Sequence, residues 1–245
     1  MKILLVGETW VTSTTHYKGF NNMSTSSFGE GYSFIVDALA KENIETDHLP
    51  AHLVQSQFPS TLQKLQEYEA VLFSDIGSDS LLLADDVFFR SQKSINKLCL
   101  VRDYVKSGGG FAMIGGYMSF TGINGSAHYK GTEIEEILPI EMLCYDDRVE
   151  RPEGVSIEIK TPEHPVFAGI DEDFPQFLGY NRLLAKEGEC LAAANGDPFI
   201  CTREYGKGKT LAFASDLSPH WGPPEFVSWK YYPRLLGNMV RYIAG

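Results

Sequence analysis

Residues 106–122 read KSGGGFAMIGGYMSFTG, and this stretch decides the fold. A helix should end at its three glycines, and the apolar run Phe111–Ile114 should form a buried strand. Gly115 and Gly116 follow directly, and glycine lets a backbone turn sharply because it tolerates positive φ and close approach. In many α/β enzymes an elbow of this kind presents the nucleophile. Here the presented residue is Tyr117, which is neither Ser nor Cys.

The rest of the chain alternates between apolar strands and amphipathic helices up to this elbow. Strands are expected at residues 2–6, 43–49 and 69–73. Helices are expected at residues 31–41, 59–68 and 94–107, the last with Ser94 as its N-cap. This alternation predicts a parallel sheet with right-handed crossovers in a single α/β domain covering residues 1–245.

The pattern changes after residue 132. A short helix is expected there, followed by more exposed antiparallel strands and a long closing helix at 226–243. The later strands are expected at residues 156–160, 190–194, 199–203 and 210–215, with a hairpin turn at 206–208. Near the start of the chain, Thr12–Ser27 is rich in Ser, Thr and Asn and has no periodicity. It predicts a long ordered loop from which His16 could reach a crevice at the strand ends.

Polar and aromatic side chains follow several of the expected strands. In open α/β sheets, ligands bind outside the carboxyl ends of the strands, so these side chains should meet in one crevice. The candidate acid–base groups are Tyr117, Asp216 and His220. The candidate ligand contacts are Glu8, Trp10, His16, Asp75, Gly116, Ser119 and Trp221.

Purely structural roles would also explain many of these candidate site residues. An Asp at a strand end often caps the next turn, which applies equally to Asp75 and Asp216, and His220 could be a packed histidine. The run Asp146–Glu150 (DDRVE) is interpreted as a solvated turn with an internal ion pair, and Tyr180 with Asn181 as either inward-facing or part of a turn. No metal site is expected, because no helix-borne ligand pair is present. No cofactor is expected either, since the glycines at 108–110 enter a strand instead of opening a helix.

The amino-acid composition limits the kinds of partner that this protein can bind and indicates where it is located. The formal net charge of −11, without a run of Lys or Arg, argues against nucleic acid and against an anionic membrane surface. The four cysteines lie far apart without ligand spacing, as expected for reduced thiols. No signal sequence or transmembrane-length apolar stretch is visible, which predicts a cytoplasmic protein. A homo-oligomer is compatible with the sequence.

Several stretches together resemble the putative glutamine amidotransferases, a bacterial family of the class I glutamine amidotransferase-like superfamily. They include KILLVGETW at the start, the elbow, ILPIEML, LGYNR and SDLSPHWG, and they span nearly the whole chain. The resemblance implies a three-layer flavodoxin-like sandwich with a mainly parallel sheet and an added antiparallel β element in the C-terminal half. It also implies a catalytic Cys at the elbow and a His and Glu after a late strand. This chain places Tyr117 at the Cys position and matches neither partner directly.

The missing thiol suggests that glutamine hydrolysis is lost, because a phenol with a pKa near ~10 is a poor acyl-transfer nucleophile. One hypothesis is a module that binds a small polar ligand such as a sugar in the crevice. The alternative is a hydrolase or isomerase of altered chemistry, with Asp216 or His220 as base and Tyr117 as acid or oxyanion donor. A structural subunit of an oligomer is a third hypothesis.

Overall fold

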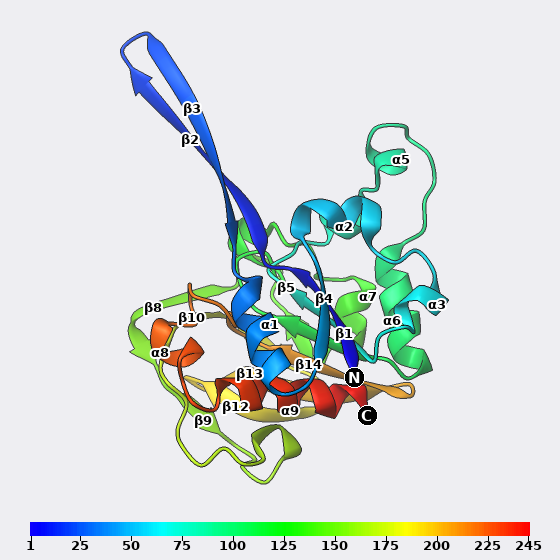
Figure 1. Ribbon diagram of the computed structural model, residues 1–245, viewed down its shortest axis with the longest axis vertical. Coiled ribbons are helices and arrows are strands. Elements are labelled where there is room, and N and C mark those ends of the chain that lie inside the picture. Colours follow the sequence, from blue (N-terminus) through cyan, green and yellow to red (C-terminus); the bar gives the residue numbers. More distant parts are fainter.

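The protein folds around an eight-stranded mixed sheet, seen in a computed structural model that describes residues 1–245 (Figure 1). The strand order is β4-β1-β5-β6-β14-β13-β12-β9. The first five strands in this order pair in parallel, and the remaining pairs are antiparallel. The strands of the sheet are β1 Lys2–Gly7, β4 Glu45–Leu49, β5 Ala70–Ser74, β6 Gly110–Ile114, β9 Ile157–Ile159, β12 Glu189–Ala194, β13 Asp197–Tyr205 and β14 Gly208–Phe213.

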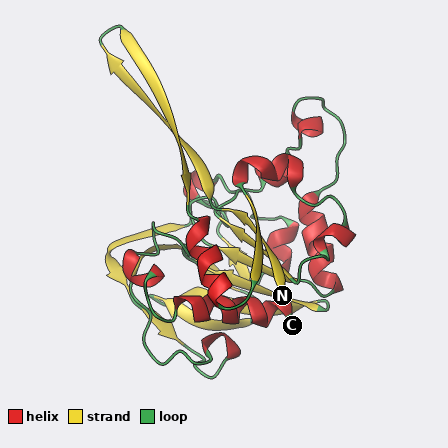
Figure 2. Ribbon diagram, viewed as in Figure 1, coloured by secondary structure: helices red, strands yellow, loops and turns green.

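Helices cover both faces of the sheet (Figure 2). The chain moves from β1 to β4 in one direction across the sheet and from β5 to β6 in the other, so right-handed crossovers place their helices on opposite faces. The helix α9 packs beside α1. The helices are α1 Tyr32–Lys41, α2 Ala51–Gln57, α3 Leu62–Leu65, α4 Asp79–Leu82, α5 Asp85–Phe88, α6 Lys97–Ser107, α7 Glu133–Ile137, α8 Pro224–Val227 and α9 Tyr232–Ala244, with 3₁₀ turns at Ile123–Gly125 and Pro165–Phe167. The predicted α/β sandwich with a C-terminal antiparallel element is confirmed.

The central strands are apolar throughout because both of their faces are covered. Every residue of β5 and of β6 is buried, and the buried apolar side chains form one continuous cluster of 60 residues. None of the helices combines the length and the apolar character needed to cross a bilayer.

Three small antiparallel sheets complete the fold. Two of them extend the C-terminal half, and the third is a long hairpin at the N-terminal end. They pair β7 Ile140–Met142 with β11 Leu183–Ala185, β8 Arg148–Val155 with β10 Phe177–Asn181, and β2 Thr9–Lys18 with β3 Asn21–Glu30.

The hairpin of β2 and β3, residues 9–30, is called the arm below. It stands away from the body as an isolated two-stranded ribbon (Figure 1). The prediction of a loop over Thr12–Ser27 is therefore wrong: these residues pair in an unbroken antiparallel register, in which Ser13 and Thr15 also hydrogen-bond through their side chains to Ser26 and Ser24. His16 pairs with Met23 on the exposed ribbon.

Three helix predictions also need correction. The helix expected at 59–68 is a single turn, α3. The N-cap of α6 is Asn96 instead of Ser94, because the Asn96 side chain accepts hydrogen bonds from two amides of the first turn. The closing helix is broken into α8 and α9, and Pro233 lies in the first turn of α9, where its missing N–H costs no hydrogen bond.

Candidate functional site

A cavity of about 430 Å³ opens at the carboxyl ends of the parallel strands. It lies where the crossover direction reverses, between β1 and β5, which is the usual ligand position in doubly wound sheets. Eight residues line it: Glu8, Trp10, Asp75, Tyr117, Asp216, Ser218, Pro219 and His220. Six of these were candidates from the sequence, and the structure brings them together from four separate segments of the chain.

The backbone at two of the strand ends is strained. Glu8 follows β1 with φ 55° and Asp75 follows β5 with φ 48°, a left-handed conformation that non-glycine residues seldom adopt. Both carboxyls are turned toward the cavity. Strain held in place by the surrounding structure is a common property of functional positions.

Gly116 forms the floor beneath two of the carboxylates. Its φ is +138°, and a Cβ at this position would lie 2.7 Å from Oδ1 of both Asp75 and Asp216. Its amide N–H donates to Asn181 Oδ1, and its carbonyl accepts from Asn181 Nδ2. The amide of Met118 donates to Asp75 Oδ1 at 2.7 Å. These two elbow amides are therefore already engaged within the protein and do not point to a free oxyanion.

A buried network behind the elbow holds the turn in place. Asp147 is 1% exposed and accepts the amides of Thr121 and Gly122, while Asn181 donates to it at 2.8 Å. The interpretation of residues 146–150 as a solvated turn is thus wrong for Asp147, although Asp146 does form the expected ion pair with Arg148. Asn181 points inward and is fully buried.

Burial and mutual repulsion raise the pKa values of the acids. Glu8 is 2% exposed, and burial, followed by the charge of Asp75, raises its pKa to about 8 despite hydrogen bonds from Ser74 and Ser218. Burial and then the charge of Asp216 raise the pKa of Asp75 to about 6. At neutral pH Glu8 is therefore a protonated acid, while Asp75 is largely ionised.

Asp216 and His220 form an acid–base pair at one wall of the cavity. Oδ2 of Asp216 lies 2.6 Å from Nδ1 of His220, and it also accepts the amide of Trp221. Burial lowers the pKa of His220, but the hydrogen bond and charge of Asp216 outweigh this effect and raise the pKa above 6.5. The imidazole side chain is 43% exposed, so its second nitrogen is accessible.

Three neighbouring side chains hold Tyr117 at the edge of the cavity. Its hydroxyl donates to Glu150 Oε1 at 2.9 Å, Arg148 lies 5.0 Å from its ring centre, and its ring meets that of His220 edge-on at 4.4 Å. Burial, followed by Glu150, raises the pKa of the phenol. Glu150, which the sequence analysis assigned to a solvated turn, thus orients the residue at the elbow.

Four sequence candidates do not line the cavity. His16 lies on the arm, and Gly116 is covered by the carboxylates. Ser119 is buried and accepts the amide of Asp75. Trp221 is 1% exposed, stacks against His220 and donates its indole N–H to Glu150, so it supports the imidazole from behind. No three His, Cys, Asp or Glu side chains are arranged as metal ligands.

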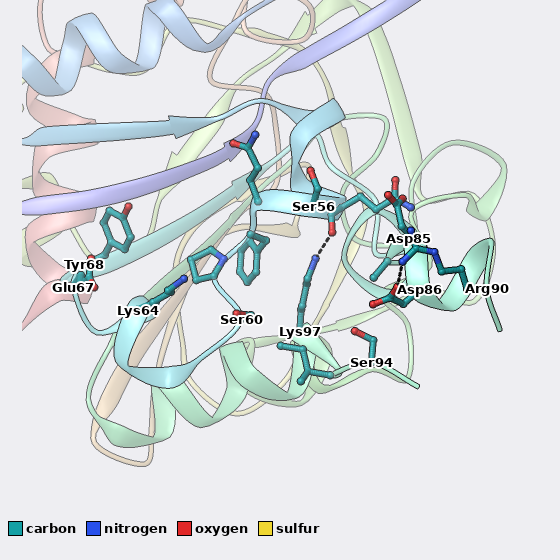
Figure 3. A pocket seen from close by; sticks show the side chains of 16 residues that line it. Ser56, Ser60, Lys64, Glu67, Tyr68, Asp85, Asp86, Arg90, Ser94 and Lys97 are labelled. Carbon is teal, nitrogen blue, oxygen red and sulfur yellow. Dashed lines mark hydrogen bonds and ion pairs between the residues drawn. The ribbon is translucent and has the colours of Figure 1, made fainter. Parts of the chain in front are cut away.

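A larger cavity, of about 670 Å³, lies away from the strand ends beside α5 (Figure 3). Three of the six charged side chains that line it already have partners. Lys97 Nζ donates to the carbonyls of Val54 and Gln55 at the end of α2, and Arg90 pairs with Asp86. The Lys97 ammonium therefore has a structural role as a helix C-cap.

Comparison with known proteins places the site in a family context. The model of the family described as putative glutamine amidotransferase matches residues 2–245. The chain belongs to this family. The solved structures of two cytoplasmic proteins, STM3548 of Salmonella typhimurium and STM1381 of Salmonella typhimurium LT2, are similar to this family member at 42% and 44% identity. Each match covers 99% of both chains at a TM-score of 0.95. The description of both relatives as cytoplasmic proteins agrees with the predicted location of this chain.

More distant matches share the fold alone. A putative ThuA-like protein from Parabacteroides merdae aligns with a TM-score of 0.58 at 12% identity, covering 99% of this chain and 89% of its own. A search of curated proteins returned no significant match.

Proposed function

We propose that this member of the putative glutamine amidotransferase family does not hydrolyse glutamine and instead binds a small polar ligand in the cavity at the strand ends. The observation that carries the proposal is Tyr117 at the elbow, where the family resemblance implies a nucleophilic Cys. None of the four cysteines lines the cavity. Tyr117 cannot substitute as a nucleophile, because its pKa is raised and its hydroxyl is bonded to Glu150.

The lining favours a ligand with several hydroxyl groups, such as a sugar. Asp75 and Asp216 offer carboxylate oxygens that accept from hydroxyls, and the protonated Glu8 adds a donor. Trp10 is about half exposed at the base of the arm and offers an aromatic face to C–H surfaces. A volume of about 430 Å³ lies within the range of small-molecule sites.

Two measurements on the purified protein test the proposal. Glutamate release from glutamine is expected to stay at the background level, and turnover that disappears in Tyr117→Phe would sink the first half of the proposal. A thermal-shift screen with sugars, sugar acids and amino acids is expected to find a stabilising ligand, because a molecule that binds only the folded state raises its apparent stability. The shift should vanish in Asp75→Asn and persist in His16→Ala, which changes a residue outside the cavity.

The Asp216–His220 pair favours a second candidate function, an enzyme of altered acid–base chemistry. Asp216 fixes the imidazole through Nδ1 and leaves Nε2 free to take or give a proton. Tyr117 contributes less to this candidate, since its proton is already directed at Glu150. Once a ligand is known, His220→Ala separates the two candidate functions. If the protein is an enzyme, the variant loses turnover but still binds the ligand. If it is a binding module, neither the wild-type protein nor the variant forms a product.

A further inference from the structure

The arm, residues 9–30, exposes an unusual amount of apolar surface. Of the fourteen large apolar side chains that are exposed in the whole chain, six lie on it. Phe20 at the turn is fully exposed, and Tyr17 and Met23 flank it near the tip. A lone two-stranded ribbon is at best marginally stable in water, and both of its edges are free to pair. The arm therefore has the composition and the shape of a surface that another protein covers.

The segment 84–96, here called the α5 segment, carries the other concentration of exposed apolar side chains. Phe88 is 61% exposed and Phe89 is 73% exposed, and the two rings pack edge-on. Both line a hollow of about 370 Å³, and Ile95 lines the larger cavity of Figure 3 on the other side of the segment. Together the arm and the α5 segment hold nine of the fourteen exposed apolar side chains.

Charge favours a contact between these two surfaces. The arm contains one Lys and one Glu, and the α5 segment contains two Asp, one Arg and one Lys, so each is formally neutral while the whole chain carries −11. Two copies of so acidic a protein repel each other wherever their bodies approach. The neutral arm of one copy and the neutral α5 segment of the other can meet without adding to this repulsion.

We propose that two copies of this chain form a reciprocal dimer, in which the arm tip of each copy packs on the α5 segment of the other. Figure 1 shows both protrusions on the same side of the body, so a two-fold axis can satisfy both contacts at once. The arm has 22 residues and the α5 segment has 13, together 35, so an interface of standard size, with its 20–30 or so residues from each partner, can form without the base of the arm.

The oligomeric mass in solution tests this proposal. Sedimentation or light scattering should give twice the chain mass for wild type. The mass should fall by half in an arm variant, Tyr17→Ser with Phe20→Ser, and equally in a segment variant, Phe88→Ser with Phe89→Ser. Phe34→Ser removes an exposed aromatic from α1 and should leave the dimer intact. A monomeric wild type would overturn the proposal.

Mixing the two defective variants identifies which surfaces meet. In a reciprocal dimer, the intact arm of the segment variant still finds the intact α5 segment of the arm variant. A one-to-one mixture should therefore recover dimers, held by one contact of the two, although each variant alone is monomeric. If the segment variant alone stays dimeric while the arm variant does not, the arms pair with each other and the α5 contact is refuted.

Discussion

Glu8→Gln should make the protein more stable at neutral pH. The pKa of Glu8 is raised from 4.5 to about 8, so the folded state keeps a proton that the unfolded chain releases over this interval. The unfolded state thus binds fewer protons, and the contribution of this group to stability falls as pH rises from 4.5 to 8. At about 1.4 kcal/mol per pH unit, the raised pKa of Glu8 lowers the free energy of unfolding at pH 7 by roughly 3 kcal/mol relative to pH 4.5. Gln has nearly the same shape and keeps partners for Ser74 and Ser218 without this cost.

The assay is urea denaturation of wild type and variant between pH 4 and pH 9. The difference in unfolding free energy should be small near pH 4, should grow steadily, and should level off above pH 8. Ser218→Ala serves as the control, since it keeps the carboxyl but removes a hydrogen bond that lowers the pKa of Glu8, so the fall in stability with rising pH should persist or become steeper. A Glu8→Gln variant that is less stable at pH 7, or whose advantage does not change with pH, would refute the assignment of a buried protonated acid.

Three other substitutions test the glycine beneath the carboxylates, the buried network behind the elbow, and the Asp216–His220 pair. Gly116→Ala should lower the unfolding free energy by about 2 kcal/mol more than Gly131→Ala in urea denaturation, because both positions have positive φ but only the first would clash with carboxylates. Asp147→Ala should cost about 3 kcal/mol by the same assay, because it leaves buried N–H groups unpaired, and a loss below half of this would contradict the network. In an NMR titration His220 should show a pKa above 6.5 that falls in Asp216→Asn, and an unchanged value would exclude Asp216 as the cause. Since that raised pKa stabilises the folded state below 6.5, this part of the stability should disappear as pH rises through the folded pKa of His220.

The sheet was predictable because its strands obey local rules. A strand buried on both faces must be an apolar run, so 2–6, 69–73 and the elbow strand stand out in the sequence, and their polar ends locate the cavity. The arm was not predictable in this way. Both of its faces are exposed, so no alternation of apolar and polar residues marks it, and its Thr-rich composition was the one available signal.

The sequence analysis also missed residues whose hydrogen-bond partners lie far away along the chain. Glu150 bonds to both Tyr117 and Trp221, and Asp147 bonds to residues more than 20 positions away along the chain. Within the sequence these acids look like a charged turn, because their hydrogen-bond partners meet them only after β8 and β10 pair. Pro233, by contrast, was a local signal for the start of a new helix that the long apolar pattern obscured.

The anchoring of Tyr117 limits what a single substitution at the elbow can achieve. A single Tyr117→Cys exchange would put sulfur at the elbow, but it would also leave Glu150 without the phenol and Arg148 without the ring on which it rests. The surroundings of the elbow are therefore matched to a tyrosine, and a thiol placed there would lack the hydrogen bond and the ring contact that hold the phenol.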